Sequence, residues 1–93
     1  MKLSEDLEQS LETAKKEAEK HHHEFVTLEH LLYGLSFNLK VREVLLNVGC
    51  DIEMLRTDLL SYFEDELSTI AVPGIKIQPR YTVGVQYVIQ FAA

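Results

Sequence analysis

The sequence predicts an all-α fold, a small four-helix bundle followed by a linker and a last segment. Apolar residues recur every three or four positions through most of residues 1–67, which is the spacing of one helix face. Residues suited to helix caps separate these periodic stretches. Residues 68–80 lack the period and contain Pro73 and Gly74, which favour a turn. The expected divisions are therefore a helical unit over 1–67, a linker over 68–80 and a separate segment over 81–93.

Length, composition and charge limit the possible functions. The chain has 93 residues, 46% of them hydrophobic, which suits one domain or part of one and leaves no room for a second enzymatic domain. The net charge of −6 repels phosphate and anionic lipid, so we expect neither nucleic acid nor a membrane as partner and favour basic proteins. A lone Cys50 and an N-terminus without a signal-peptide pattern predict a cytoplasmic location.

The first helix is expected over residues 4–22. Ser4 is its expected N-cap, and acidic residues follow in the first turn, where the helix dipole favours anions. Lysines and histidines gather near the other end, where the dipole favours cations. The apolar positions are three or four residues apart and form one stripe: Leu3, Leu7, Leu11, Ala14 and Ala18.

A short second helix is expected to begin after Thr27, because the threonine hydroxyl can accept from an unpaired amide of the first turn. A helix of this length is not stable alone, so its leucine face must dock on the first helix. Gly34 is expected to let another backbone approach closely. The leucine face consists of Leu28, Leu31, Leu32 and Leu35.

Two further helices are expected before residue 68. Gly49 stands where a left-handed C-terminal cap of the third helix is expected, and Asp51 is the expected N-cap of the fourth. The third helix places on one face Val41, Val44, Leu45 and Val48. The fourth places on one face Ile52, Leu55, Leu59, Tyr62 or Phe63, and Leu67.

Residues 81–93 allow two interpretations. Their β-branched and aromatic content favours a strand. A helix with Thr82 as N-cap is equally coherent. The segment ends on an apolar run without a polar tail, so we expect the chain to be part of something longer. In the helical interpretation one face consists of Val85, Val88, Ile89 and Ala92.

No catalytic constellation is present in the sequence. The four glycines are isolated, and none belongs to a phosphate-binding loop, so neither ATP nor another cofactor is expected here. Cys50 is followed by an acid, Asp51, and has no base next to it in the sequence that could activate the thiol. We therefore interpret Cys50 as a small buried or half-buried residue.

The histidines suggest a metal-binding or ligand-sensing alternative. His21, His22, His23 and His30, with Glu24, could supply several ligands. Three consecutive residues at a helix end point in different directions, however, and no further pair has zinc spacing. Capping and packing near the end of a helix is the interpretation that the sequence favours.

Glu24 and Glu29 flank the turn into the second helix. Composition alone favours solvated surface charge, with Glu29 close to the positive end of a helix dipole. The alternative is an acidic spot that receives a basic partner.

The run His-Glu-Phe-Val-Thr-Leu-Glu-His-Leu-Leu at residues 23–32 resembles the start of the N-terminal domain of Clp ATPases. The ClpA-type unfoldases, which feed the ClpP peptidase, are the most similar subclass. Supporting similarities lie in Arg-Glu-Val-Leu at 42–45, in residues 51–56, and in the spacing of Thr, Gln, Val, Ile, Gln and Ala over 82–92. The resemblance therefore spans nearly the whole chain.

This resemblance implies a fold with two similar four-helix repeats. The chain would hold the first repeat and only the opening helix of the second, which makes residues 81–93 helical. The apolar face of that last helix would then lack its usual neighbours. We expect it to pack back on the first repeat or against a second copy, which would give a homodimer.

The resemblance also implies a docking function without catalysis. In the family, the N-terminal domain stands above the ATPase ring and receives the ClpS adaptor, which brings N-degron substrates, as well as unfolded proteins. The adaptor contacts implied by matching positions are Glu24, Glu29 and Thr82, with His23 in support. Tyr33, Gly34 and the loop at 68–80 depart from the family pattern.

A rival hypothesis is a ClpC-like module that recognises a phosphorylated side chain. Such a module would need a basic pocket. The residues that could form one are Lys40, Arg42 and Arg56.

Overall fold

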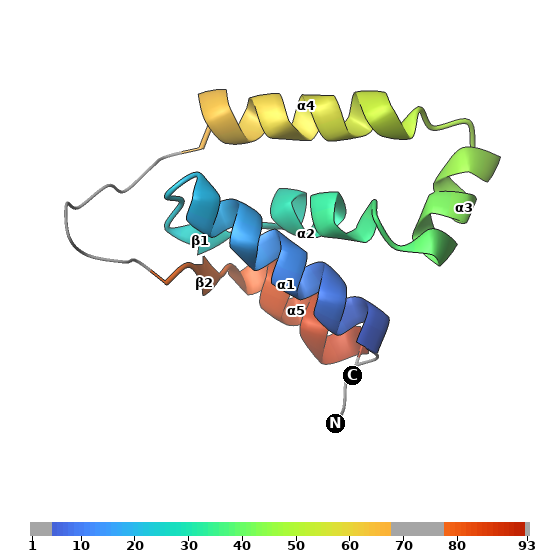
Figure 1. The fold of residues 1–93 in the computed structure, drawn as a ribbon. Coiled ribbons are helices and arrows are strands. Elements are labelled where there is room, and N and C mark those ends of the chain that lie inside the picture. Colours follow the sequence, from blue (N-terminus) through green and yellow to red (C-terminus); the bar gives the residue numbers. More distant parts are fainter. Residues whose placement is uncertain (1–4, 68–77, 93) are drawn as a thin grey trace.

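The computed structural model describes residues 5–67 and 78–92 as an arrangement of five helices with one pair of very short strands (Figure 1). The predicted all-α fold is confirmed. Residues 81–93 were open between strand and helix, and most of this segment is helical. The elements are α1 (Glu5–Lys20), β1 (Phe25–Val26), α2 (Leu28–Leu35), α3 (Leu39–Asn47), α4 (Ile52–Asp65), β2 (Arg80–Tyr81) and α5 (Val83–Ala92).

Helices α1 and α2 form the closest packing in the described chain. A Cβ atom added at Gly34 would overlap the carbonyl oxygen of Ser10 in α1, so the expected close backbone approach is confirmed. The predicted stripe of α1 is buried at Leu11, Ala14 and Ala18. The expected N-cap at residue 4 lies outside the described residues.

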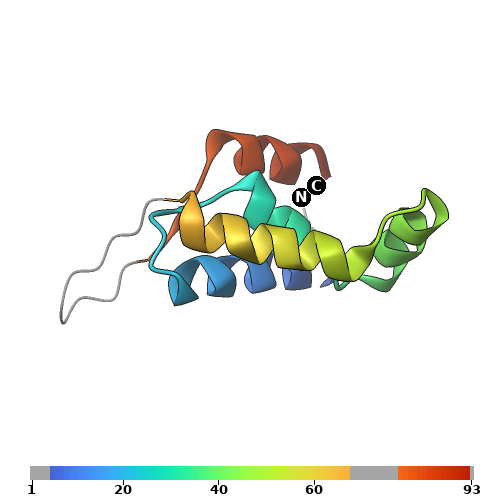
Figure 2. The same ribbon diagram turned by 90° about the horizontal axis from the view of Figure 1, so that it is seen from above.

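Helix α2 lies between α1 and α5 when the molecule is seen from above (Figure 2). The core that joins the three helices consists of Leu11, Leu31 and Val85, one from each helix. Helix α5 begins at the predicted cap, because the Thr82 hydroxyl accepts from the amide of Val85 at 3.3 Å.

Leu28 differs from the prediction. The leucine face of α2 was expected to be buried as a whole, and Leu31 is buried, but Leu28 remains 47% exposed. The reason is its neighbour: the Leu28 side chain lies against Gly84 of α5, and a glycine has no side chain to cover it.

Helix α4 packs across α2 mainly through Phe63, which is fully buried, and it buries Ile52 and Leu59 as well. The predicted N-cap is confirmed, since the Asp51 carboxylate accepts from the amide of Met54 at 3.0 Å. No helix within 5–67 or 78–92 is both long enough and apolar enough to cross a membrane.

Helix α3 has the predicted C-terminal end and an unexpected exposure. Gly49 has a φ of 85°, and the amide of Cys50 donates to the Leu45 carbonyl at 2.9 Å, as in a glycine-terminated helix end. The predicted apolar face is largely uncovered, however, with Val44 61% and Val48 75% exposed. Figure 1 shows the reason, because α3 stands at the end of the molecule, where it lies beside the start of α4.

Candidate functional site

A two-stranded parallel sheet brings together two segments that are far apart in the sequence. Phe25 pairs with Arg80, and Val26 pairs with Tyr81. The amide of Arg80 donates to the Glu24 carbonyl at 3.0 Å, and the amide of Thr82 donates to the Val26 carbonyl at 3.1 Å. The sheet therefore fixes the backbone on both sides of the predicted contacts.

Three of the predicted site residues surround this sheet. Glu24 is exposed directly before β1, and Thr82 is half-buried directly after β2. Glu29 is half-buried in the first turn of α2, which starts two residues after β1. The structure thus places Glu24 at one end of the short sheet and Thr82 at the other, with Glu29 in the first turn of the helix that follows β1.

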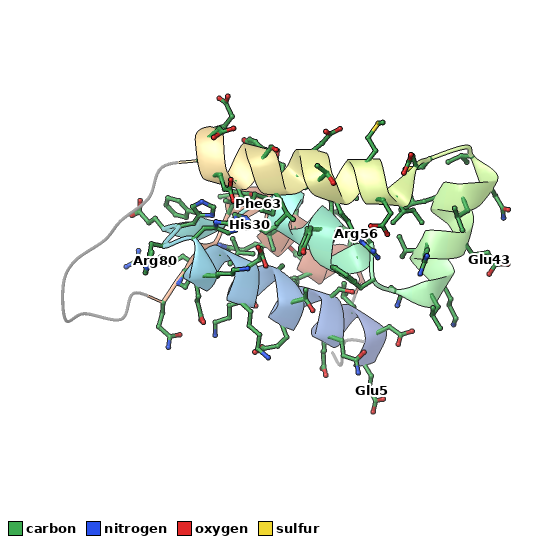
Figure 3. All side chains as sticks on the ribbon, turned by 45° about the horizontal axis from the view of Figure 1, so that its top comes forward. Glu5, His30, Glu43, Arg56, Phe63 and Arg80 are labelled. Carbon is green, nitrogen blue, oxygen red and sulfur yellow. The ribbon has the colours of Figure 1, made fainter. Side chains whose placement is uncertain are left out.

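His23 has a different environment from the other predicted contacts. Its side chain is only 2% exposed, and its ring lies between α2 and α4. His30 is fully buried and stacks flat on Phe63, with the ring centroids 4.4 Å apart (Figure 3). Both histidines are therefore packed in the interior of the protein.

A chain of hydrogen bonds fixes the tautomers of these two rings. His23 Nε2 lies 2.8 Å from the Phe63 carbonyl, which only accepts, so this nitrogen carries a proton. Neutral His23 then accepts at Nδ1, and its partner His30 Nε2 must donate across 2.9 Å. His30 Nδ1 in turn accepts from the amide of Thr27 at 2.9 Å. Both rings are therefore neutral and protonated at Nε2.

This chain also caps α2. The Thr27 hydroxyl accepts from the amide of His30, and the His30 ring accepts from the amide of Thr27, which makes a reciprocal capping box. The predicted N-cap at Thr27 is confirmed. The contribution of His30 was not predicted, and its position three residues after the threonine is the one signal in the sequence that could have indicated it.

The environment keeps both rings uncharged. Burial, together with the nearby His23, lowers the pKa of His30 to about 4, against the opposing effect of the Glu29 carboxylate. Burial also lowers the pKa of His23, although its hydrogen bond to the Phe63 carbonyl acts in the other direction.

The metal-binding alternative is not supported. All four ring nitrogens of His23 and His30 are engaged by the protein itself. His21, directly after α1, lies with its Nε2 2.9 Å from the carboxylate of Glu17 on that helix. Among the residues that the structure describes, no group of three or more His, Cys, Asp or Glu side chains could hold a metal ion.

The basic pocket required by the phosphate-binding hypothesis is also not supported. Arg56 donates from Nη2 to the Ser36 carbonyl at 2.7 Å and from Nε to the Ser36 hydroxyl at 3.0 Å. Its guanidinium lies 4.0 Å above the ring of Phe37. These contacts hold Arg56 in a structural position at the end of α2.

The fold and the site together define a small helical domain with an exposed acid beside a short parallel sheet. Residues 2–93 match the Clp repeat (R) N-terminal domain, and the chain belongs to this family. It is also similar to a ClpA homolog protein of Fuscovulum blasticum, with 37% identity over 93 residues that cover 98% of this chain. The chain spans 12% of the length of that relative.

Proposed function

We propose that this chain is the adaptor- and substrate-docking module of a ClpA-type AAA+ unfoldase in the cytoplasm. In this function it receives a ClpS-like adaptor and unfolded or tagged proteins, and the rest of the parent protein links it to the ATPase ring and ClpP. It carries out no catalysis. Family membership and the similarity to a ClpA homologue support the proposal.

The observation that carries the proposal is the short parallel sheet that fixes the backbone at both residues, with Glu24 at the start of one strand and Thr82 at the end of its neighbour. An exposed carboxylate on a fixed backbone can make charge-assisted hydrogen bonds with a basic partner without first being ordered. Such contacts weaken as salt screens the charges. Glu29, one helical turn away, adds to the same negative potential.

Charge reversal tests the proposal. We expect a ClpS-like adaptor to bind the chain, and Glu24→Lys or Glu29→Lys to weaken binding by tenfold or more, which corresponds to about 1.4 kcal/mol each. The matched control is Glu43→Lys, an exposed position on α3 at the other end of the molecule from Arg80 (Figure 3). Titration calorimetry at low and high salt measures these affinities.

The control separates a local contact from the effect of net charge. All three variants change the charge equally, so binding should be weakened only by the two reversals near the sheet. If Glu43→Lys weakens adaptor binding as much as the other variants do, the attraction is non-specific. If neither Glu24→Lys nor Glu29→Lys weakens adaptor binding, the proposed site is overturned.

We also propose that a second copy covers the C-terminal half of α5. Tyr87 and Phe91 are 57% and 83% exposed and lie four residues apart on one face. Helix α5 contains no charged residue, so two chains of net charge −6 can meet there without facing charges. Light scattering should detect a dimer that Phe91→Lys dissociates, whereas a monodisperse monomer of the unchanged chain would refute this.

A further inference from the structure

Phe25 is a large apolar side chain held outward by a rigid backbone. Along β1 the side chains alternate, so Val26 is fully buried while Phe25 is 42% exposed. The pairing of β1 with β2 and the cap at Thr27 fix the backbone on both sides of Phe25. Because this backbone is already fixed, a partner that covers Phe25 has to order only its aromatic side chain, which has few rotatable bonds.

Two hollows of opposite charge meet at Phe25. The first has a volume of about 210 Å³, and its walls include Glu24, Thr27 and Leu67. Its charged wall residue is the acid Glu24, while the buried His23 beneath it is neutral in the hydrogen-bond chain. A lysine or arginine side chain suits this hollow, because it can pair with the carboxylate and lie against the phenylalanine ring.

The second hollow lies on the other side of Phe25 and is open, with a volume of about 500 Å³. Tyr81 and Val83 supply apolar wall, and Val83 is 68% exposed. Arg80, the strand partner of Phe25, is the charged residue of this wall. The positive charge of Arg80 repels a basic side chain of the partner, which is therefore directed into the first hollow. An apolar side chain of the partner fits the second hollow.

We propose that Phe25 is the central contact of the docking surface, and that the partner presents a basic and an apolar side chain next to each other, one to each hollow. This inference rests on the proposed function and adds to it. The acids supply the salt-dependent part of the binding. Phe25 and Val83 supply a part that does not depend on salt and that selects the partner.

The test measures the affinity of a ClpS-like adaptor for this chain over a series of salt concentrations. We expect Phe25→Ser to weaken binding by tenfold or more and to leave the dependence on salt unchanged, because it removes apolar area and no charge. Glu24→Gln should weaken binding at low salt and reduce the salt dependence. The two changes should therefore separate the two kinds of contact.

Val83→Ser provides a second variant, and α3 supplies its matched control. We expect Val83→Ser to weaken binding by about threefold or more, since it removes part of the apolar wall. Val48→Ser is the control, because Val48 is 75% exposed on a helix remote from the sheet. It should leave the affinity within about twofold of the unchanged chain. Circular dichroism establishes that each variant is folded.

The outcomes separate this inference from the proposed function. If the unchanged chain does not bind the adaptor, the proposed function is overturned and this inference with it. If the chain binds, and Phe25→Ser and Val83→Ser both keep its affinity and salt dependence, only the inference is overturned. If Phe25→Ser is unfolded, Val83→Ser against Val48→Ser decides the question.

Discussion

His30 occupies the position that glutamate or glutamine holds in an ordinary capping box. The sequence alone predicts Thr27 as the cap, because its residue type and the following apolar run are local signals. It does not predict that a histidine completes the box, since the other side of that ring is held by His23 and, through it, by a carbonyl of α4. These residues lie far apart in the sequence, so the contacts between them form only when the helices pack together.

The neutral state of His30 predicts how stability depends on pH. The pKa of His30 is about 4 in the folded chain and 6.5 in an unfolded one, so the unfolded chain takes up a proton first as the pH falls. The stabilisation of the folded chain by neutral His30 is therefore complete above pH 6.5. As the pH falls from 6.5 to 4, this stabilisation of about 3 kcal/mol is progressively lost. The lowered pKa of His23 acts in the same direction. Urea unfolding at a series of pH values measures this loss.

A variant isolates the contribution of His30 from those of other titrating groups. Glutamine at this position can still accept from the Thr27 amide but does not titrate, so His30→Gln should reduce the slope of stability against pH. His22→Asn is the control: His22 is exposed with a φ of 58°, which asparagine tolerates, and the slope should stay that of the unchanged chain. A His30→Gln slope equal to the original would contradict the lowered pKa of His30.

At the scale of helices, the sequence predicts where a helix begins and ends better than it predicts which helices contact one another. The caps at Thr27, Gly49 and Asp51 are all in place, because each depends on a few adjacent residues. Val44 and Val48 lie on the apolar face that the periodic pattern predicts, but both are exposed. The pattern says which side chains share a face, but whether another helix covers that face depends on the tertiary arrangement.

Gly34 tests the contact between α1 and α2. Alanine there would place a methyl group against the Ser10 carbonyl, which belongs to a helix backbone and cannot turn away. We therefore expect Gly34→Ala to destabilise the fold by about 1–3 kcal/mol in chemical unfolding, despite the better helix propensity of alanine. Gly84→Ala is the matched change, because its added methyl meets the side chain of Leu28, which is 47% exposed and free to shift, rather than a helix backbone. It should be neutral or stabilising, and equal losses at both glycines would argue against this packing.

At the scale of the molecule, the site depends on a pairing that no local signal predicts. A strand of two residues is too short to show the alternating pattern by which strands are recognised in a sequence. In addition, β1 and β2 are separated along the chain by three helices. Glu24 and Thr82 could be grouped from the sequence only through the resemblance to Clp domains. The sheet gives the physical reason for the grouping, since its hydrogen bonds join the two segments directly.

Arg56 joins α4 to the α1, α2 and α5 core at the end opposite Phe63. Two of its nitrogens bind Ser36 while its planar group lies over Phe37, and an ammonium group cannot make all of these contacts. We expect Arg56→Lys to lower the free energy of unfolding by about 1–2 kcal/mol, whereas Arg42→Lys, at an exposed position on α3, should change it by less than about 0.5 kcal/mol. Urea unfolding of both variants measures the difference. Equal stability of the two would mean that Phe63 and its neighbours hold α4 without this arginine.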